Sequence, residues 1–118
     1  EECYNSLSEF LSIKKTDLTI KTSVVKVSKL NNFKIKNVSL IKIDSEGYEK
    51  EVLVGMNDYL KQNINIILEN TQTSFEFAKK FLEGYGYKCY RYQNGSFTNQ
   101  KLKEALNLYF LKKNDVNF

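Results

Sequence analysis

The chain has 118 residues, with 18 basic and 14 acidic side chains, two cysteines, and no histidine, proline or tryptophan. Its length predicts a single domain, and its hydrophobic content of 42% excludes a disordered chain. No apolar run approaches the roughly 18 residues of a membrane-spanning helix, so we expect a soluble protein. The lack of histidine excludes Ser-His-Asp catalysis, and two cysteines cannot form a four-thiolate zinc site or a disulfide framework. Together these features indicate a reducing, cytoplasmic setting.

The two signs of charge are distributed differently along the chain. The net charge is +4, but 17 of the 18 cations are scattered lysines, and Arg91 is the only arginine. Because base and phosphate recognition favours arginine, we interpret the lysines as a solvated surface and expect no nucleic-acid partner. The acids are more concentrated, since five of the 14 lie in one short stretch: Asp44, Glu46, Glu49, Glu51 and Asp58. This acidic stretch is therefore the first place to look for chemistry.

The first half of the chain predicts three strands and one helix. Residues 1–22 are poorly patterned, and the β-branched residues 23–27 predict a short strand. Residues 38–43 form an apolar run that is typical of a strand covered on both faces. Apolar residues then recur at helical spacing and predict an amphipathic helix over residues 48–61. Residues 64–68 predict a second buried strand.

The second half of the chain predicts one more helix and two more strands. Residues 75–85 show helical spacing, and Gly84 and Gly86 predict a left-handed end to this helix. Residues 87–92 predict a strand, an Asn-Gly turn follows, and residues 106–111 predict the last strand. Alternating strands and helices are typical of parallel sheets with right-handed crossovers. The predicted fold class is therefore α/β, with a largely parallel sheet and an antiparallel finish.

Two carboxylates follow the apolar strands at the points where ligands bind in parallel sheets. Asp44 ends the first of these strands and Glu69 ends the second, so neighbouring strands about 5 Å apart would bring both within reach of one substrate. Glu46 lies two residues beyond Asp44, in the turn before the helix, and Gly47 allows the backbone to turn sharply there. The sequence thus predicts a functional site with Asp44 and Glu69 at its centre.

Structural roles are the alternative for the same polar residues. Asp44 or Ser45 could cap the N-terminus of the following helix, and Glu46 and Glu49 could interact with its dipole. Asn70, next to Glu69, could be an ordinary turn residue. The five glycines form no glycine-rich turn between an early strand and a helix, so neither a dinucleotide-binding fingerprint nor a P-loop is present.

At the acidic stretch the sequence resembles a known family. Residues 39–55, SLIKIDSEGYEKEVLVG, resemble the signature of FkbM-type methyltransferases, in which a strand leads through Lys-Ile-Asp-x-Glu-Gly into a helix. The run INIILEN at residues 64–70 is similar to the next strand of that family, and residues 24–30 are similar to a preceding strand. The resemblance covers approximately residues 23–113.

This resemblance implies S-adenosylmethionine-dependent O-methyl transfer on a Rossmann-like class I methyltransferase fold. The implied acceptor is a hydroxyl of a sugar or other glycan precursor, or of a small secondary metabolite. The family's cofactor loop lies on earlier strands, so residues 23–118 would be the C-terminal half of the domain, preceded by the poorly patterned residues 1–22. Cofactor-binding residues are not assigned to the chain, and alone it is expected to be inactive.

Within that framework the carboxylates acquire expected roles. Asp44 would act as the base or orient the hydroxyl, and Glu69 would hold a second hydroxyl or adjust the pKa of Asp44 through its charge. Glu46 would fix the turn. No metal is assigned, although an alternative has Asp44, Glu69 and Asn70 holding Mg²⁺ through oxygen ligands.

A non-catalytic module is the competing class of function. If the earlier strands of the sheet are missing, one sheet edge is left bare, and bare edges recruit other strands. The chain would then bind a partner chain or self-associate through that edge.

Overall fold

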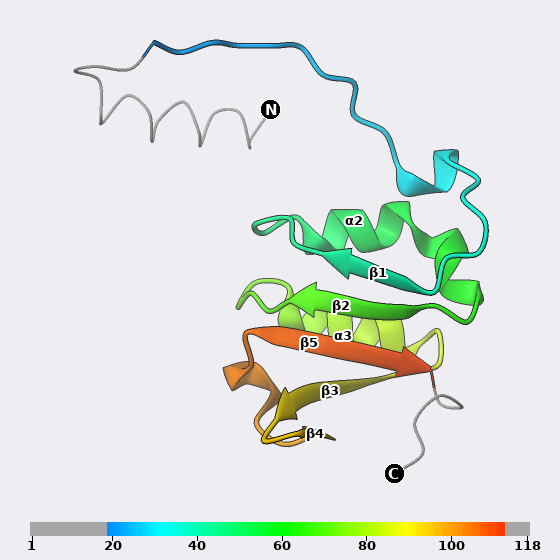
Figure 1. Ribbon diagram of the computed structural model, residues 1–118, viewed down its shortest axis with the longest axis vertical. Helices are drawn as coiled ribbons and strands as arrows, with labels where there is room; N and C mark the ends of the chain where they lie inside the picture. Colours follow the sequence, from blue (N-terminus) through cyan, green and yellow to red (C-terminus); the bar gives the residue numbers. More distant parts are fainter. Residues whose placement is uncertain (1–18, 113–118) are drawn as a thin grey trace.

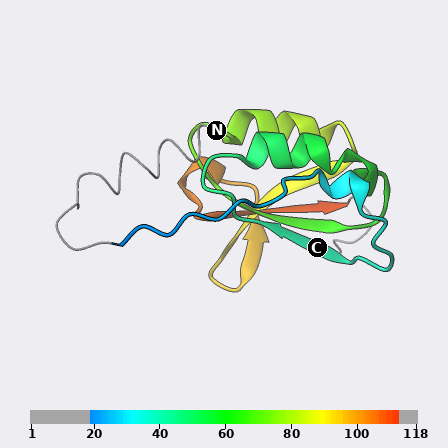
Figure 2. The same ribbon diagram turned by 90° about the horizontal axis from the view of Figure 1, so that it is seen from above.

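The computed structural model describes residues 19–112, which form a five-stranded sheet with two α-helices on one of its faces (Figures 1 and 2). The strands are β1 (Leu40–Ile43), β2 (Asn65–Glu69), β3 (Tyr87–Gln93), β4 (Ser96–Thr98) and β5 (Asn107–Lys112). The helices are α2 (Glu49–Gly55) and α3 (Phe75–Glu83), with short 3₁₀ turns η1 (Leu30–Asn32), η2 (Asn57–Lys61) and η3 (Leu102–Glu104). In this part of the chain, no helix has the length and apolar character needed to cross a membrane.

The sheet is mixed, which corrects the prediction of a largely parallel sheet. Its strand order is β1-β2-β5-β3-β4, and among these neighbours only β1 and β2 pair in parallel. Strands β1, β2 and β3 do run in one direction, because β5 is antiparallel to both β2 and β3. Strand β5 lies between β2 and β3, so these two parallel strands each pair with an antiparallel neighbour and not with each other. The predicted antiparallel finish is confirmed.

The core lies between the sheet and the two helices. Alternate residues of the central strands point towards the helices and are fully buried, including Leu68 on β2 and Phe110 on β5. Leu53 of α2 and Leu82 of α3 cover them and are equally buried. Burying each such side chain contributes about 1.5–3 kcal/mol, so these contacts fix the two helices over one face.

Four predicted strands are observed within two residues of their expected bounds, but one helix is shorter than predicted. The expected helix over residues 48–61 ends at Gly55, and the chain continues as the 3₁₀ turn η2. Glycine weakens a helix, and here its missing side chain also admits Lys29, whose Cγ would lie 3.4 Å from a Cβ. The left-handed end predicted after the next helix occurs at Gly86 (φ 91°) and not at Gly84 (φ −62°).

The predicted strand at residues 23–27 is not formed. Residues 19–29 are extended and exposed, and they run outside the sheet (Figure 1). A β-branched segment becomes a strand only by pairing with a neighbouring strand, and these residues pair with none within the described part of the chain. Of the predicted N-terminal segment at residues 1–22, residues 1–18 lie outside the described residues.

Candidate functional site

The carboxyl ends of β1 and β2 bring three acidic side chains together. Ile43 pairs with Leu68 in the parallel register, so Asp44, which follows β1, emerges beside Glu69 at the end of β2. Asp44, Glu46 and Glu69 each offer one oxygen, and these oxygens lie within 4.8 Å of one another. The predicted approach of Asp44 and Glu69 is confirmed. Glu46, a predicted residue of the same site with the expected role of fixing the turn, lies close enough to join them.

The turn between β1 and α2 explains how Glu46 reaches the other two acids. Glu46 (φ 53°) and Gly47 (φ 103°) both have left-handed backbone conformations, which reverse the chain immediately after Asp44. Gly47 is required here by its backbone angle, since nothing lies within 4 Å of the position of a Cβ. Because α2 begins at Glu49 with Tyr48 as its N-cap residue, the alternative in which Asp44 or Ser45 caps this helix is wrong.

The neighbouring acids raise the affinity of Glu69 for a proton. Hydrogen bonding with the Asp44 carboxyl raises the pKa of Glu69 to about 7, helped by desolvation and by the negative charges of Asp44, Glu46 and Glu49. Glu69 is half-buried, and its Oε2 atom is shielded from solvent without a hydrogen-bond partner. With its pKa raised in this way, Glu69 is partly protonated close to neutral pH.

Glu49 is the site residue that the sequence interpretation missed. It was expected at the solvated start of the helix, but its side chain is fully buried. Its Oε1 accepts a hydrogen bond from the Gly47 N–H (3.2 Å), and its Oε2 accepts one from the Thr71 hydroxyl (3.5 Å). The sequence did contain a signal for this burial. Glu49 lies four residues before Leu53 and seven before Met56, so helical spacing places it on the same face as these two buried side chains.

Asn70 is neither an ordinary turn residue nor part of the acid group. Its side-chain amide nitrogen donates to the main-chain carbonyls of Leu102 (3.3 Å), Lys103 (3.2 Å) and Ala105 (2.8 Å). These bonds attach the end of β2 to the segment that precedes β5. The group of converging oxygens therefore contains Glu46 in place of Asn70. Its all-oxygen character could suit Mg²⁺, whereas the soft ligands that favour zinc are absent from it.

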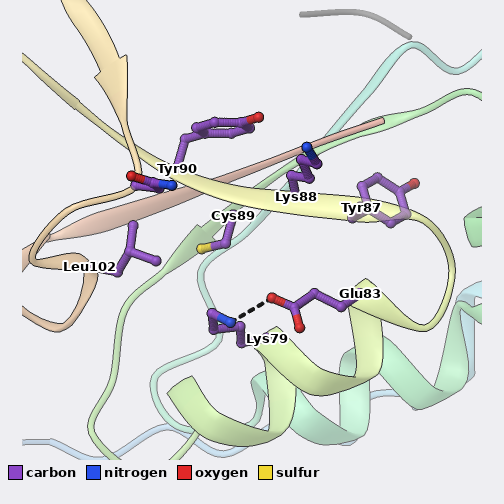
Figure 3. Close-up of a pocket in the computed structure, with 8 residues that line it drawn as sticks. Lys79, Glu83, Tyr87, Lys88, Cys89, Tyr90 and Leu102 are labelled. Carbon is purple, nitrogen blue, oxygen red and sulfur yellow. Dashed lines mark hydrogen bonds and ion pairs between the residues drawn. The ribbon is translucent and has the colours of Figure 1, made fainter. Parts of the chain in front are cut away.

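Two of the cavities near the sheet differ in their relation to the acids. A groove of about 1020 Å³ between β1, α2 and residues 27–33 is mostly apolar and has Asp44 and Ser45 at one end. A pocket of about 520 Å³ lies at the other end of the sheet order, between α3 and β3 (Figure 3). There the Lys79–Glu83 ion pair (2.6 Å) faces Cys89, and burial raises the pKa of the Cys89 thiol to about 12. Cys89 is thus a buried thiol of low reactivity.

Comparison with known family models gives a match that covers most of the chain. A family model described as "Methyltransferase FkbM domain" matches residues 4–89, which include β1, β2, the three clustered acids and Glu49. No curated protein and no solved structure shows significant similarity to the chain. The mixed sheet with its two helices is compatible with part of a methyltransferase fold.

Proposed function

Because the chain belongs to the FkbM methyltransferase family, we propose that it forms part of an S-adenosylmethionine-dependent O-methyltransferase. The proposed acceptor is a hydroxyl of a sugar, a glycan precursor or a secondary metabolite. The observation that carries the proposal is the convergence of Asp44, Glu46 and Glu69 at the carboxyl ends of two parallel strands, where open sheets bind ligands. The family match does not favour a non-catalytic binding module.

The described residues do not provide a site for the methyl donor. S-adenosylmethionine supplies an electrophilic methyl group, and the resemblance places its binding loop on strands that precede residue 23. In residues 19–112 no strand leads through a glycine-rich turn into a helix, and the β1–α2 turn contains one glycine, Gly47. No donor contact is therefore assigned to this chain. We propose that residues 23–118 form the C-terminal, acceptor-binding part of a Rossmann-like domain.

The acids suit the acceptor side of an O-methyl transfer. A hydroxyl is a weak nucleophile at neutral pH, so a carboxylate within hydrogen-bond distance would help by accepting its proton. We assign this role to Asp44, while Glu69 holds a neighbouring hydroxyl and shares a proton with Asp44. A pKa of about 7 for Glu69 means that this carboxyl, next to Asp44, loses its proton in the neutral range, where a general base is most effective.

The direct test is a methyl-transfer assay with the complete domain. S-adenosylmethionine carrying a ¹³C-labelled methyl group is incubated with a panel of sugars and other polyhydroxylated acceptors. We expect a labelled methyl group bonded to oxygen, identified by its carbon chemical shift, together with S-adenosylhomocysteine. Transfer to nitrogen or carbon would contradict the proposal, as would hydrolysis of the donor with no labelled product.

A further inference from the structure

We propose that Glu49 is a positioning residue that holds the Asp44–Glu46 turn and the end of β2 in one arrangement. The inference rests on the proposed function, since it explains how the acceptor-binding acids are kept together. Glu49 itself does not reach the acceptor, because its side chain is fully buried.

The burial of Glu49 sets it apart from an ordinary acid in the first turn of a helix. Such acids interact with the helix dipole from the surface, as the exposed Glu51 of the same helix can do. Burying a carboxylate costs free energy unless hydrogen bonds replace its water. Both oxygens of Glu49 accept hydrogen bonds, and the two donors belong to different loops.

The two donors connect the parts of the chain that carry the acids. Gly47 lies in the β1–α2 turn, one residue after Glu46, and Thr71 lies two residues after Glu69 in the β2–α3 loop. The Thr71 hydroxyl also lies 2.5 Å from that of Ser74, which is buried at the start of α3. Glu49 therefore bridges the two loops and anchors both to α3.

The turn needs this bridge because its own bonding is sparse. It contains two consecutive left-handed residues, and its internal main-chain bond, from the Tyr48 N–H to the Ser45 carbonyl, is long at 3.3 Å. Without the Glu49 carboxylate, the turn would be free to move away from β2. Asp44 and Glu46 would then separate from Glu69, although the sheet and the core would remain.

The test measures the protonation of Glu69 in the 118-residue chain by ¹³C NMR of its carboxyl carbon. Glu49→Met removes both hydrogen bonds while filling the buried space, and Thr71→Val removes one hydrogen bond without changing any charge. Glu51→Met is the matched control, since it makes the same substitution at an exposed position of the same helix. Amide exchange at Gly47 is measured in parallel as a direct report on the turn.

We expect the Glu69 midpoint to lie near 7 in the unmodified chain and in Glu51→Met. In Glu49→Met and Thr71→Val it should fall by about one unit or more towards the ordinary value for glutamate, with faster exchange at Gly47. The fall of the Glu69 midpoint in Thr71→Val is the decisive result, because this substitution removes no charge. The same measurement tests the inference even if Glu49→Met fails to fold.

An unchanged midpoint in folded Thr71→Val would overturn the inference, and so would an ordinary midpoint in the unmodified chain. These measurements use no methyl donor. The inference can therefore fail while methyl transfer is observed, and methyl transfer can be absent while the Glu49 bridge is confirmed.

Discussion

At the scale of single residues, four neighbouring carboxylates lie in different environments. Asp44 and Glu46 are exposed on a tight turn, Glu69 is half-buried, and Glu49 is fully buried. The sequence predicted that Asp44 and Glu69 would meet, because both follow apolar runs and parallel strands share an edge. It could not predict the place of Glu46, which depends on two left-handed backbone angles in succession.

Asp44→Asn should lower kcat of the complete enzyme by roughly a hundredfold or more, within the range for loss of a general base. The amide has the size of the carboxylate but cannot accept the proton of the hydroxyl. Folding should be retained, since Asp44 caps no helix in this structure. Turnover and thermal midpoint are measured with one acceptor. Glu46→Gln is the paired control and should cost less activity; near-normal turnover of folded Asp44→Asn would remove Asp44 from the mechanism.

The raised pKa of Glu69 also predicts how stability depends on pH. The folded chain binds the Glu69 proton with a pKa of about 7, compared with 4.5 for the unperturbed group. Between these two values the folded state holds more protons than the unfolded state, so the Glu69 contribution to stability is full below pH 4.5 and is lost as pH rises through 7. Glu69→Gln should remove the loss of stability that the parent chain shows as pH rises from 4.5 through 7.

Denaturant unfolding of both proteins across this pH range measures the effect. Glu76→Gln serves as the control, because Glu76 is exposed on the surface of α3. If the parent chain and Glu69→Gln lost stability equally as pH rises, the proton shared with Asp44 would be ruled out.

At the scale of elements, local patterns predicted which segments become strands but not which strands become neighbours. The sequence patterns predicted four strands to within two residues of their observed bounds, because burial and alternation are local properties. The insertion of β5 between β2 and β3 depends on pairing between segments about 40 and 20 residues apart in sequence. The helical spacing over residues 48–61 correctly predicted buried side chains, yet it did not distinguish an α-helix from an α-helix followed by a 3₁₀ turn.

Lys112 joins the ends of three elements. Its Nζ atom donates to the carbonyls of Leu60 and Tyr85, both at 2.7 Å, and lies 4.3 Å from the centre of the Tyr87 ring. Burial lowers the pKa of Lys112. This side chain therefore connects η2 and the end of α3 to β5.

Lys112→Met should lower the free energy of unfolding by about 2 kcal/mol or more, because it removes two hydrogen bonds from a charged donor and leaves two carbonyls without it. Urea denaturation at neutral pH measures the change. Lys88→Met, at an exposed position of β3, should change stability by less than about 0.5 kcal/mol. A similarly small change for Lys112→Met would show that the Lys112 contacts do not contribute to the free energy of unfolding.

At the scale of the whole molecule, two strand-forming features lack a partner in residues 19–112. The outer edge of β1 pairs with no strand, and residues 19–29 extend beyond that side of the sheet without joining it (Figure 1). The extended segment has three lysines and no acid, whereas the end of β1 carries Asp44 and Glu46. Exposed edges recruit complementary strands, so a second copy of this chain is a suitable partner for each feature.

The 118-residue chain should therefore self-associate by pairing its extended segment with β1 of a second copy. Val27→Asp should weaken the association, because Val27 is 89% exposed in the segment and would be covered in the pair. Leu106→Asp is the control, since Leu106 is equally exposed (85%) but lies before β5, away from the β1 edge. Sedimentation equilibrium over a wide concentration range tests this, and a monomer throughout would refute it.

The same 118-residue chain should bind S-adenosylmethionine weakly, with a dissociation constant above about 1 mM. The described residues contain no glycine-rich strand-to-helix turn, and the groove between β1, α2 and residues 27–33 is mostly apolar. Isothermal titration calorimetry measures the affinity. Micromolar binding would mean that the donor contacts lie in this chain after all.

The pH dependence of methyl transfer by the complete enzyme shows whether the carboxyls of Asp44 and Glu69 act as the base. With a saturating acceptor, kcat should rise with pH, level off above an apparent pKa near 7, and lose this dependence in Glu69→Gln. A kcat that stays constant from about pH 5 to about pH 9 in the unmodified enzyme would contradict this role.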